Sequence, residues 1–577
     1  MEIKPAQTFL QKKFLSLLLP GSMGMLVVTA LLLSDSIVAG IALGKDAVAA
    51  ISLVTPAYSV ASFFGGMIAI GVPILFARAM GEFDQKAAAR WFSLGLTTAA
   101  MLGGSMFALL LIFGDSFLLF YEPGQTVFLL AKPYLFWYSC TILLAPLNML
   151  MTEMVLTDGD ESISVVANIA QMTGNLLLSI VLAPFWGLAG IGFASFAGTG
   201  LSLAISCLHF FRPGSSLKPG LYFSFRGLAV AAKYSAIDAS SYLFIAVFTL
   251  VINRFIVSSY GEEMLILVAV ILFIKEFQLV FDGIGEAITP LVNTYLGEES
   301  YAGVKKCYVL AQKAAVVEAV LVLVFLVLLA PLVTKVYGLT DGPAAVYATK
   351  GIRIMALGFV PISLLYLLSS YYLLIDRILL GVAICGMRDM LVAVPACIIC
   401  GKLFGLYGLF FGSALSPLLA YIITLLYVRL RYGKANCPLL LTEKAAAVKA
   451  AFYEFTVTPE QVIATQKQIE AFLTSAGVNK KMVFHCKQLV EDLYMLIYEK
   501  NGGGKQRILA ECTVILRDNA VQIITKDDGL LFDLSDEDAN AVSCLAFVVS
   551  GYMDALKGNK KYLTTMSYNR NTFKVTD

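Results

Sequence analysis

The feature that most constrains the fold is an apolar stretch from Phe14 to Leu43 that contains a single acid, Asp35, in LVVTALLLSDSIVAGIAL. About 20 apolar residues are enough to span a bilayer as a helix. A carboxylate at that depth costs at least about 2.5–3.5 kcal/mol, so intramembrane acids usually face a bundle interior or an ion path. We therefore interpret Asp35 as the residue that binds a coupling proton or cation. The alternative is a structural acid satisfied by Ser34, Ser36 or a neighbouring helix.

Composition indicates an integral membrane protein with many spans. Of its 577 residues, 59% are hydrophobic and 14% are charged, and the mean hydropathy is +0.80, whereas soluble domains carry about 25% charged residues. The net charge of +2 gives no indication of a nucleic-acid partner. Only two histidines are present and the ten cysteines are scattered, so we expect no metal site and interpret Cys397 and Cys400 as helix-packing residues.

Twelve apolar segments follow one another and predict an all-α membrane bundle. They cover residues 14–43, 47–79, 91–114, 132–157, 162–184, 187–211, 228–259, 264–296, 303–334, 351–375, 378–404 and 406–430. Each run is continuous rather than alternating, which favours helices over a barrel. Lys and Arg are in excess in the loops on the N-terminal side, so we expect a multi-pass protein of the bacterial plasma (inner) membrane with both termini cytoplasmic.

The two sets of six segments repeat each other. GGMIAIGVPILFARAMGEFDQKAAARW in the second segment is matched by FDGIGEAITPLVNTYLGEESYAGVKKC in the eighth. Such repeats are related by an axis along the membrane normal, with a substrate path between the lobes. We expect two six-helix lobes, residues 1–220 and 221–432.

Polar residues inside the first lobe suggest an ion site. Asn168, Gln171 and Asn175 are three and four apart and share one helical face. Together with Asp35 and Thr199 they offer oxygen ligands for Na⁺ or a proton relay. The alternative is ordinary hydrogen bonding between helices.

The second lobe carries more charge. Lys275, Asp282 and Glu286 are spaced by seven and four residues and lie on roughly one face. We interpret them, with Asp238, as lining a substrate cavity, because several charges facing lipid would be prohibitive. Lys275–Glu276 and Arg388–Asp389 are candidate compensated pairs.

Several of these stretches resemble the multidrug and toxic compound extrusion (MATE) family. They are LLLSDSIVAGIALGKDAVAAISLVTP (31–56), IAIGVPILFARAMGEFDQKAAAR (68–90), LTDGDESISVVANI (156–169), GLAGIGFASFAG (187–198) and the repeat copy GIGEAITPLVNTYLGE (283–298). The resemblance implies a V-shaped twelve-helix antiporter that exports drugs, organic cations or metabolites against Na⁺ or H⁺, with the family's first-helix acid at Asp35. The chain departs from the family at Ser179 and Ala183, where an Asn and an Asp are usual, and at Leu156, where a basic residue is usual.

After Tyr432 the composition changes. Residues 433–451 read as a basic, Ala-rich linker, and residues 452–577 as a cytoplasmic α/β two-layer sandwich. FYEFTV predicts a strand, Thr458-Pro459 predicts the start of a helix, and residues 481–499 show helical periodicity. ILAECTVILRD and AVQIITKDD alternate as a hairpin. AVSCLAFVVSGYMDAL predicts another helix, and KKYLTTMSYNRNTFKV predicts the closing strands.

This order resembles the GHKL ATPase fold in its anti-sigma-factor kinase branch, through QLVEDLYMLIYEKNGG (488–503) and KDDGLLFD (526–533). The resemblance implies a water-binding carboxylate at Glu491 and an adenine-binding carboxylate at Asp527. The magnesium Asn is replaced by Met495, and the Gly-x-Gly reads Gly529-Leu530-Leu531. Methionine is a poor ligand for Mg²⁺ and leucine blocks close backbone approach. We therefore expect a degenerate domain without ATPase activity or cofactor, which binds a cytoplasmic regulatory protein or senses nucleotide. The alternative is a fused remnant that mainly aids folding.

These features predict a secondary transporter of a small-molecule substrate in the lipid bilayer rather than an enzyme. An ATP-driven pump is disfavoured because the chain has no Walker motif. A membrane-anchored signalling protein, whose C-terminal domain binds nucleotide or a regulatory partner, is the alternative function. A lipid flippase would also be a helical bundle of this size, but its transport would show no dependence on an ion gradient.

Overall fold

The structure is a computed structural model. It describes residues 8–81, 84–121, 124–158, 160–212, 215, 217–339, 342–441, 448–504, 506–517, 520–530 and 568–576. The chain divides into two compact units. Unit 1 comprises Met1–Met23, Gly283–Ala314 and Leu425–Asp577, and unit 2 comprises Gly24–Asp282 and Ala315–Thr424.

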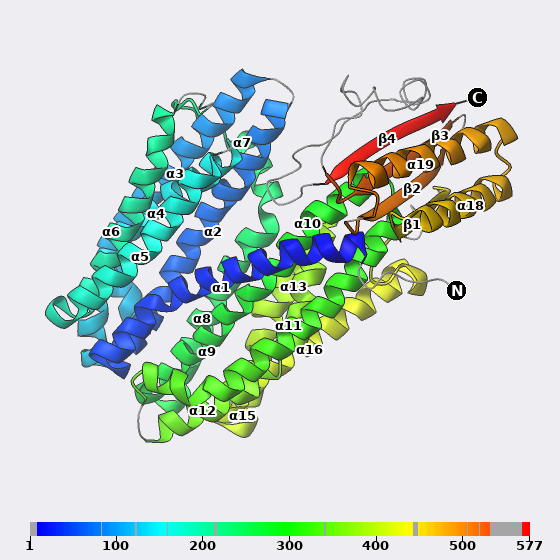
Figure 1. The fold of residues 1–577 in the computed structure, drawn as a ribbon. Coiled ribbons are helices and arrows are strands. Elements are labelled where there is room, and N and C mark those ends of the chain that lie inside the picture. The colour runs from blue at the N-terminus through cyan, green and yellow to red at the C-terminus, as the bar shows by residue number, and fades with distance from the viewer. Residues whose placement is uncertain are drawn as a thin grey trace. The chain divides into compact units, whose positions relative to one another are not determined.

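Helices dominate the described chain from Phe9 to Tyr432 (Figure 1). They are α1 (Phe9–Leu43), α2 (Lys45–Gly81), α3 (Gln85–Leu119), α4 (Gln125–Thr157), α5 (Glu161–Trp186), α6 (Leu188–Cys207), η1 (Leu208–Phe211), α7 (Phe225–Tyr234), α8 (Ala236–Tyr260), η2 (Glu262–Met264), α9 (Ile266–Phe277), η3 (Gln278–Phe281), α10 (Asp282–Gly297), α11 (Tyr301–Val336), α12 (Pro343–Ala356), α13 (Phe359–Leu374), α14 (Ile378–Gly386), η4 (Met387–Leu391), α15 (Ala393–Phe404), α16 (Leu406–Tyr432) and η5 (Lys434–Asn436).

Ten of the helical segments in the described residues are long and apolar enough to cross a membrane, or eleven if the bent pair α12–α13 is one span. Helix α1 has 35 residues but is not among these ten, because only its stretch Leu33–Leu43 is found as an apolar helix and it is shorter than the others. Helices satisfy every backbone hydrogen bond within the segment, which is what a spanning element requires. The mostly helical membrane architecture predicted from the apolar runs is therefore confirmed, and the number twelve stays a prediction.

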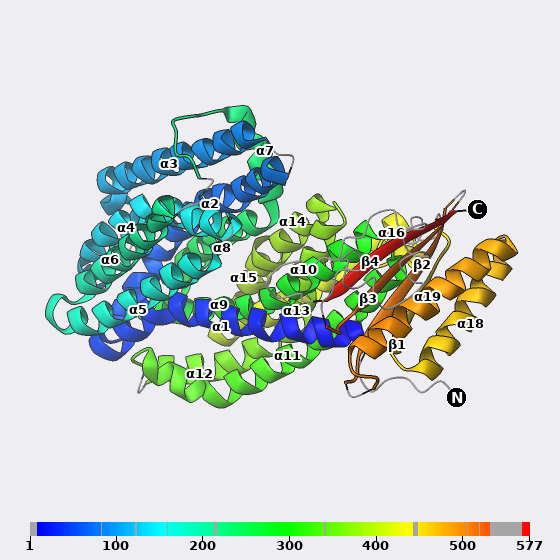
Figure 2. The ribbon, with the colours of Figure 1, turned by 45° about the horizontal axis from the view of Figure 1, so that its top comes forward.

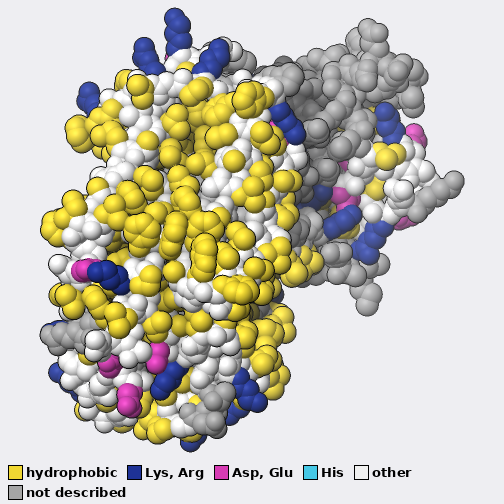
Figure 3. All heavy atoms as spheres, turned by 90° about the vertical axis from the view of Figure 1, so that its left-hand side faces the viewer, with side chains coloured by type: hydrophobic (Ala, Val, Ile, Leu, Met, Phe, Trp, Pro, Cys, Tyr) yellow, Lys and Arg dark blue, Asp and Glu magenta, His cyan; other side chains and the backbone are white. Residues whose placement is uncertain are grey.

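Within unit 2, α2, α3, α4, α5 and α6 pack against one another (Figure 1). Helices α3 and α5 have most of their apolar stretch unburied. Figure 3 shows a face dominated by hydrophobic side chains, with few charged groups across its middle. This face has the composition of a lipid-facing surface, since a monomeric soluble protein rarely exposes so large an apolar patch. The exposed apolar residues of α3 and α5 include Ile112, Val166 and Leu177.

Some predicted single segments are broken in the structure. Helix α12 is bent by 51° relative to α13. The predicted segment 378–404 contains a π-helical turn, η4, between α14 and α15. The predicted segment 228–259 is divided at Ser235 into α7 and α8. π-turns and short breaks of this kind occur often at functional positions in helices.

In unit 1 a four-stranded antiparallel sheet follows the last long helix. Its strands are β1 (Ala450–Thr456), β2 (Leu509–Arg517), β3 (Ala520–Asp527) and β4 (Asn569–Thr576), in the order β1-β2-β3-β4. Helices α18 (Pro459–Ser475) and α19 (Lys480–Lys500) pack together on one face of this sheet (Figure 2). Thr458 caps α18 by accepting a hydrogen bond from the Gln461 amide, as its position before a proline predicts.

The hydrophobic core of this domain lies between the helices and the sheet. It contains Leu493 and Ile497 from α19, and Cys512, Ile523 and Phe573 from the strands. The strand alternation therefore sends one set of side chains toward the helices and the other set to the opposite face. The predicted helix AVSCLAFVVSGYMDAL lies outside the described residues.

Candidate functional site

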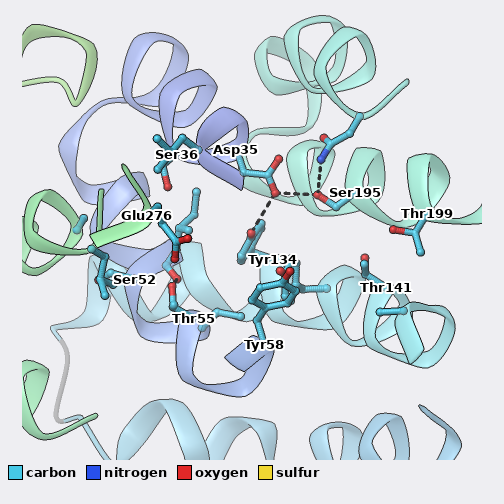
Figure 4. A pocket seen from close by; sticks show the side chains of 18 of the residues that line it. Asp35, Ser36, Ser52, Thr55, Tyr58, Tyr134, Thr141, Ser195, Thr199 and Glu276 are labelled. Atoms are coloured by element: carbon cyan, nitrogen blue, oxygen red, sulfur yellow. Dashed lines mark hydrogen bonds between the residues drawn. The ribbon is translucent and has the colours of Figure 1, made fainter. Parts of the chain in front are cut away.

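A polar cavity of about 200 Å³ lies within unit 2. Helices α1, α2, α4, α5, α6 and α9 all contribute side chains to it, together with Tyr337, the residue after α11. Figure 4 shows hydroxyl, amide and carboxylate groups converging on this space from different helices. We call it the chamber.

Asp35 enters the chamber from α1. Ser195 Oγ of α6 donates a hydrogen bond of 2.7 Å to Asp35 Oδ2, and the Tyr134 hydroxyl of α4 donates a longer one of 3.4 Å (Figure 4). The other oxygen, Oδ1, is buried and has no hydrogen-bond partner among the described residues. A buried carboxylate oxygen without a partner is costly, so this position is suited to a bound proton or cation.

A chain of amides and hydroxyls surrounds this acid. Asn175 Nδ2 donates to Ser195 Oγ at 3.3 Å, and Ser179 Oγ donates to Asn175 Oδ1 at 3.0 Å. On the next turns, Gln171 Nε2 donates to Thr199 Oγ1 at 3.3 Å and Gln171 Oε1 accepts from Asn148 at 3.0 Å. Three of the four residues predicted to accompany Asp35, namely Gln171, Asn175 and Thr199, thus line the same chamber.

Asn168, the fourth, is placed elsewhere. Its side chain is exposed and does not line the chamber. It precedes Gln171 by three residues, and that turn of α5 lies beyond the cavity. Shared helical face alone therefore does not determine which residues reach a cavity, because the cavity covers only part of the helix length.

Glu276 is a chamber residue that the sequence interpretation missed. It was paired with its neighbour Lys275, yet its carboxylate makes no hydrogen bond or ion pair with another described side chain. Ala269, Leu272, Phe273 and Glu276 all line the chamber, and their spacing of three and four residues is one helical stripe. Tracing that stripe along ILVAVILFIKEF would have identified the acid.

The remaining walls of the chamber are aromatic and polar. Tyr58, Tyr134, Tyr138, Tyr337 and Phe273 line it, and Tyr134 stacks on Tyr138 with ring centroids 5.2 Å apart. No Lys, Arg or His is found among the described lining residues. Two acids among aromatic rings make an environment that attracts cations, since ring faces carry negative potential.

Two buried cations, Lys275 and Arg388, line a separate, much smaller cavity in unit 2. Lys275 Nζ lies 3.6 Å from Asp389 Oδ1 and 4.4 Å from the centre of the Phe248 ring. Arg388 Nη2 is 2.7 Å from Asp389 Oδ2, and the guanidinium stacks on the Tyr366 ring at 3.8 Å. The π-helical turn η4 carries both members of the Arg388–Asp389 pair, so these adjacent residues form a buried ion pair.

The predicted substrate-cavity cluster of Lys275, Asp282, Glu286 and Asp238 is not brought together in the chamber. Lys275 lines the smaller cavity. Asp282 is half-buried and Glu286 is exposed, and neither lines the chamber or the smaller cavity. Asp238 lies on α8, but its side chain is outside the described residues.

The nucleotide-like residues lie in the C-terminal domain. Asp527, at the end of β3, is buried, and its Oδ1 accepts hydrogen bonds from the Gly529 amide and from Asn569 Nδ2 at 3.0 and 2.9 Å. Burial raises the pKa of Asp527 to about 7, although the hydrogen bond from Asn569 opposes that shift. Glu491 accepts a 2.6 Å hydrogen bond from Gln466 of α18, and Met495 is half-buried one turn later.

The fold and the chamber define a class: a polytopic helical membrane protein with a polar cavity inside its helix bundle. A model of the MatE family matches residues 20–184, which include Asp35. The chain has the fold of MATE transporters. An inward-facing multidrug resistance MATE family transporter of the MOP superfamily aligns with a TM-score of 0.63 and 17% identity, over 70% of this chain and 94% of that one.

Two further solved structures show the same fold. An outward-facing multidrug resistance MATE family transporter aligns with a TM-score of 0.60 and 19% identity, over 73% of this chain and 95% of that one. A MOP superfamily transporter from Pyrococcus furiosus, described by the reverse polarity of its binding pocket, aligns with a TM-score of 0.60 and 20% identity, over the same shares. No curated protein matches the chain.

Proposed function

We propose that this protein is a secondary active antiporter that exports organic cations, including drugs or metabolites, in exchange for H⁺ or Na⁺. The observation that carries the proposal is the chamber, where Asp35 and Glu276 face a space walled by tyrosines and hydroxyls. The MatE match over residues 20–184 and the shared fold support it. Transport, rather than catalysis, is the activity of such a chamber.

The two acids have separate roles in this proposal. Asp35, held by Ser195 and Tyr134, binds the coupling ion with the help of Gln171, Asn175 and Thr199. Glu276 attracts the cationic group of the substrate, and the aromatic walls stack on it. Competition between the coupling ion and the substrate for one acidic chamber links the two fluxes, because each lowers the affinity for the other.

The proposed setting is the bacterial plasma membrane, with twelve spans in two six-helix lobes and both termini in the cytoplasm. The excess of Lys and Arg in the loops on the N-terminal side supports this orientation. The C-terminal domain is then cytoplasmic, where we assign it a regulatory role.

The test is efflux of a fluorescent organic cation from proteoliposomes under an imposed pH gradient or an imposed Na⁺ gradient. We expect one of the two gradients to drive efflux, and we expect Asp35→Asn to abolish this gradient-driven efflux. Asp115→Asn is the matched control, because that acid lies on α3 with its side chain 55% exposed and pairs with Lys132. Unchanged gradient-driven efflux in Asp35→Asn would remove Asp35 as the coupling site, and efflux that ignores both gradients would refute antiport.

A further inference from the structure

The C-terminal sheet carries a row of four charged residues, one on each strand. Glu454 pairs in register with Glu511, Glu511 with Lys526, and Lys526 with Arg570. These residues alternate with core residues that face α18 and α19, so they point to the face of the sheet that these two helices leave uncovered. Glu511 and Lys526 are only 1% and 3% exposed, which is rare for charged residues without partners.

Each charge in the row has a partner between the end of α10 and the first turns of α11. Lys306 Nζ lies 2.6 Å from Glu454 Oε2, and the Tyr295 hydroxyl donates to Glu511 at 2.7 and 2.8 Å. Two bases, Lys526 and Arg570, donate to the two oxygens of Glu298 at 2.7 and 2.8 Å. All of these groups belong to unit 1.

The row of charges on the sheet and its partners between α10 and α11 are complementary in charge. The acidic half of the sheet row meets a lysine and a hydroxyl, and its basic half meets the buried carboxylate of Glu298. Removing one partner of a buried pair leaves an uncompensated charge and is strongly destabilising. The arrangement therefore favours the observed docked position of the sheet, because a shift by one strand would in one direction bring Glu511 opposite Glu298 and in the other leave Glu454 without its lysine.

Further contacts flank the row. Arg517 at the end of β2 pairs with Glu299 at 2.7 Å, and the Tyr295 ring packs edge-on against Phe452 of β1. The first turn of α1 also reaches the domain. Lys12 Nζ lies 2.6 Å from Asp528, and Phe9 packs edge-on against Tyr568.

We propose that the helix-free face of the sheet is an intramolecular docking surface, through which the C-terminal domain clamps the start of α1 to α10 and α11 and slows transport. Helix α1 continues to Asp35, and α10 follows the Glu276-bearing helix α9 through η3. Because the domain binds both the first turn of α1 and the stretch that joins α10 to α11, it restrains the movement of α1 relative to α10 and α11. The slowing of transport rests on the proposed function, whereas the docking does not.

Docking is measured in the full-length protein by thiol labelling at Thr513→Cys. Thr513 is 2% exposed and lies on the docking face, paired with Phe452. Cys512 next to it is buried in the core against the helices. Mass spectrometry of fragments determines which of the two cysteines carries the label. The Thr513→Cys protein is the parent for three variants, which are Lys306→Glu, Glu454→Lys and the double charge swap. Lys305→Glu is the matched control, because it reverses a charge one residue away from Lys306.

We expect each single reversal to accelerate labelling about fivefold or more, since an attractive pair is replaced by a repulsive one. The double swap and Lys305→Glu should label at the parent rate. Labelling that does not accelerate in the single variants, or is not restored by the swap, overturns the docking surface.

Export of the fluorescent cation is measured in the same variants. We expect faster initial export in both single reversals and the parent rate in the swap. Faster labelling with unchanged or slower export overturns the restraint and leaves the docking standing. A parent protein that exports nothing under either gradient refutes the proposed function instead, and the labelling comparison still decides the docking.

Discussion

The close approach between the backbones of α1 and α11 at Gly40 offers a direct test of how α1 packs near the chamber. Gly40, five residues beyond Asp35, packs against the end of α11. A Cβ at this position would lie 2.1 Å from the carbonyl oxygen of Val336 and 2.9 Å from Cα of Tyr337. The neighbouring groups are backbone, so they cannot rotate away as a side chain could.

The cost of Gly40→Ala can be worked from these distances. An ordinary contact at a Cβ is 3.4 Å or more, so α1 and α11 must separate by about 1 Å or more at this point. Overpacking of this kind costs about 1–3 kcal/mol. The better helix propensity of alanine returns up to about 1 kcal/mol, so the net loss of stability should be about 0–2 kcal/mol when the full amount is returned.

The matched control is Gly104→Ala in α3, where nothing lies within 4 Å of the added Cβ. This variant should be unchanged or up to about 1 kcal/mol more stable. Free energies of unfolding, measured by denaturant titration in mixed micelles, give the comparison. Equal stability of the two variants would show that α1 and α11 are not in contact at Gly40, and would refute the packing described above.

Three further predictions concern the acids. Glu276→Gln should raise KM for a cationic substrate about tenfold or more in efflux assays and leave a neutral substrate unaffected, and an equal effect on both would argue against a cation site. Ser195→Ala removes the 2.7 Å hydrogen bond to Asp35, the proposed coupling acid, and should cut gradient-driven efflux about tenfold, whereas Ser202→Ala on the same helix should not. Burial raises the pKa of Glu511 from its ordinary 4.5 to about 7, with Lys526 opposing the shift. The contribution of Glu511 to docking is then largest below pH 4.5 and is lost as pH rises toward about 7. Labelling at Thr513→Cys should therefore accelerate over that range beyond the intrinsic rise seen in the Glu511→Gln variant, and parallel profiles would contradict this.

Much of the fold was predictable because continuous apolar runs have few structural solutions in a membrane. The segment predicted at 162–184 is α5, Glu161–Trp186, and the predicted helix 481–499 is α19, Lys480–Lys500. The breaks were not predictable in the same way. The π-turn η4 contains no proline or glycine, so the sequence carries neither of the residues that usually mark a break in a helix.

The site was predictable only in part. Asp35 was identified from the cost of a buried charge, and Gln171 and Asn175 from their shared face. Glu276 was missed because its neighbour in sequence, Lys275, suggested a compensated pair, whereas adjacent residues on a helix point in different directions. The docking row was missed for a different reason. Strand alternation predicts which residues of β2 share a face, but it does not reveal whether a second layer covers that face.

The docking partners on the helical side lie almost entirely in one stretch, from Tyr295 to Lys306. Attachment of the sheet therefore depends on a short turn of the chain rather than on a surface assembled from many places. Substitution of the partners between Tyr295 and Lys306 is the smallest change that would detach the domain. Transfer of this segment, together with the first turn of α1, to another protein of the same fold is the smallest change that would let that protein bind the domain.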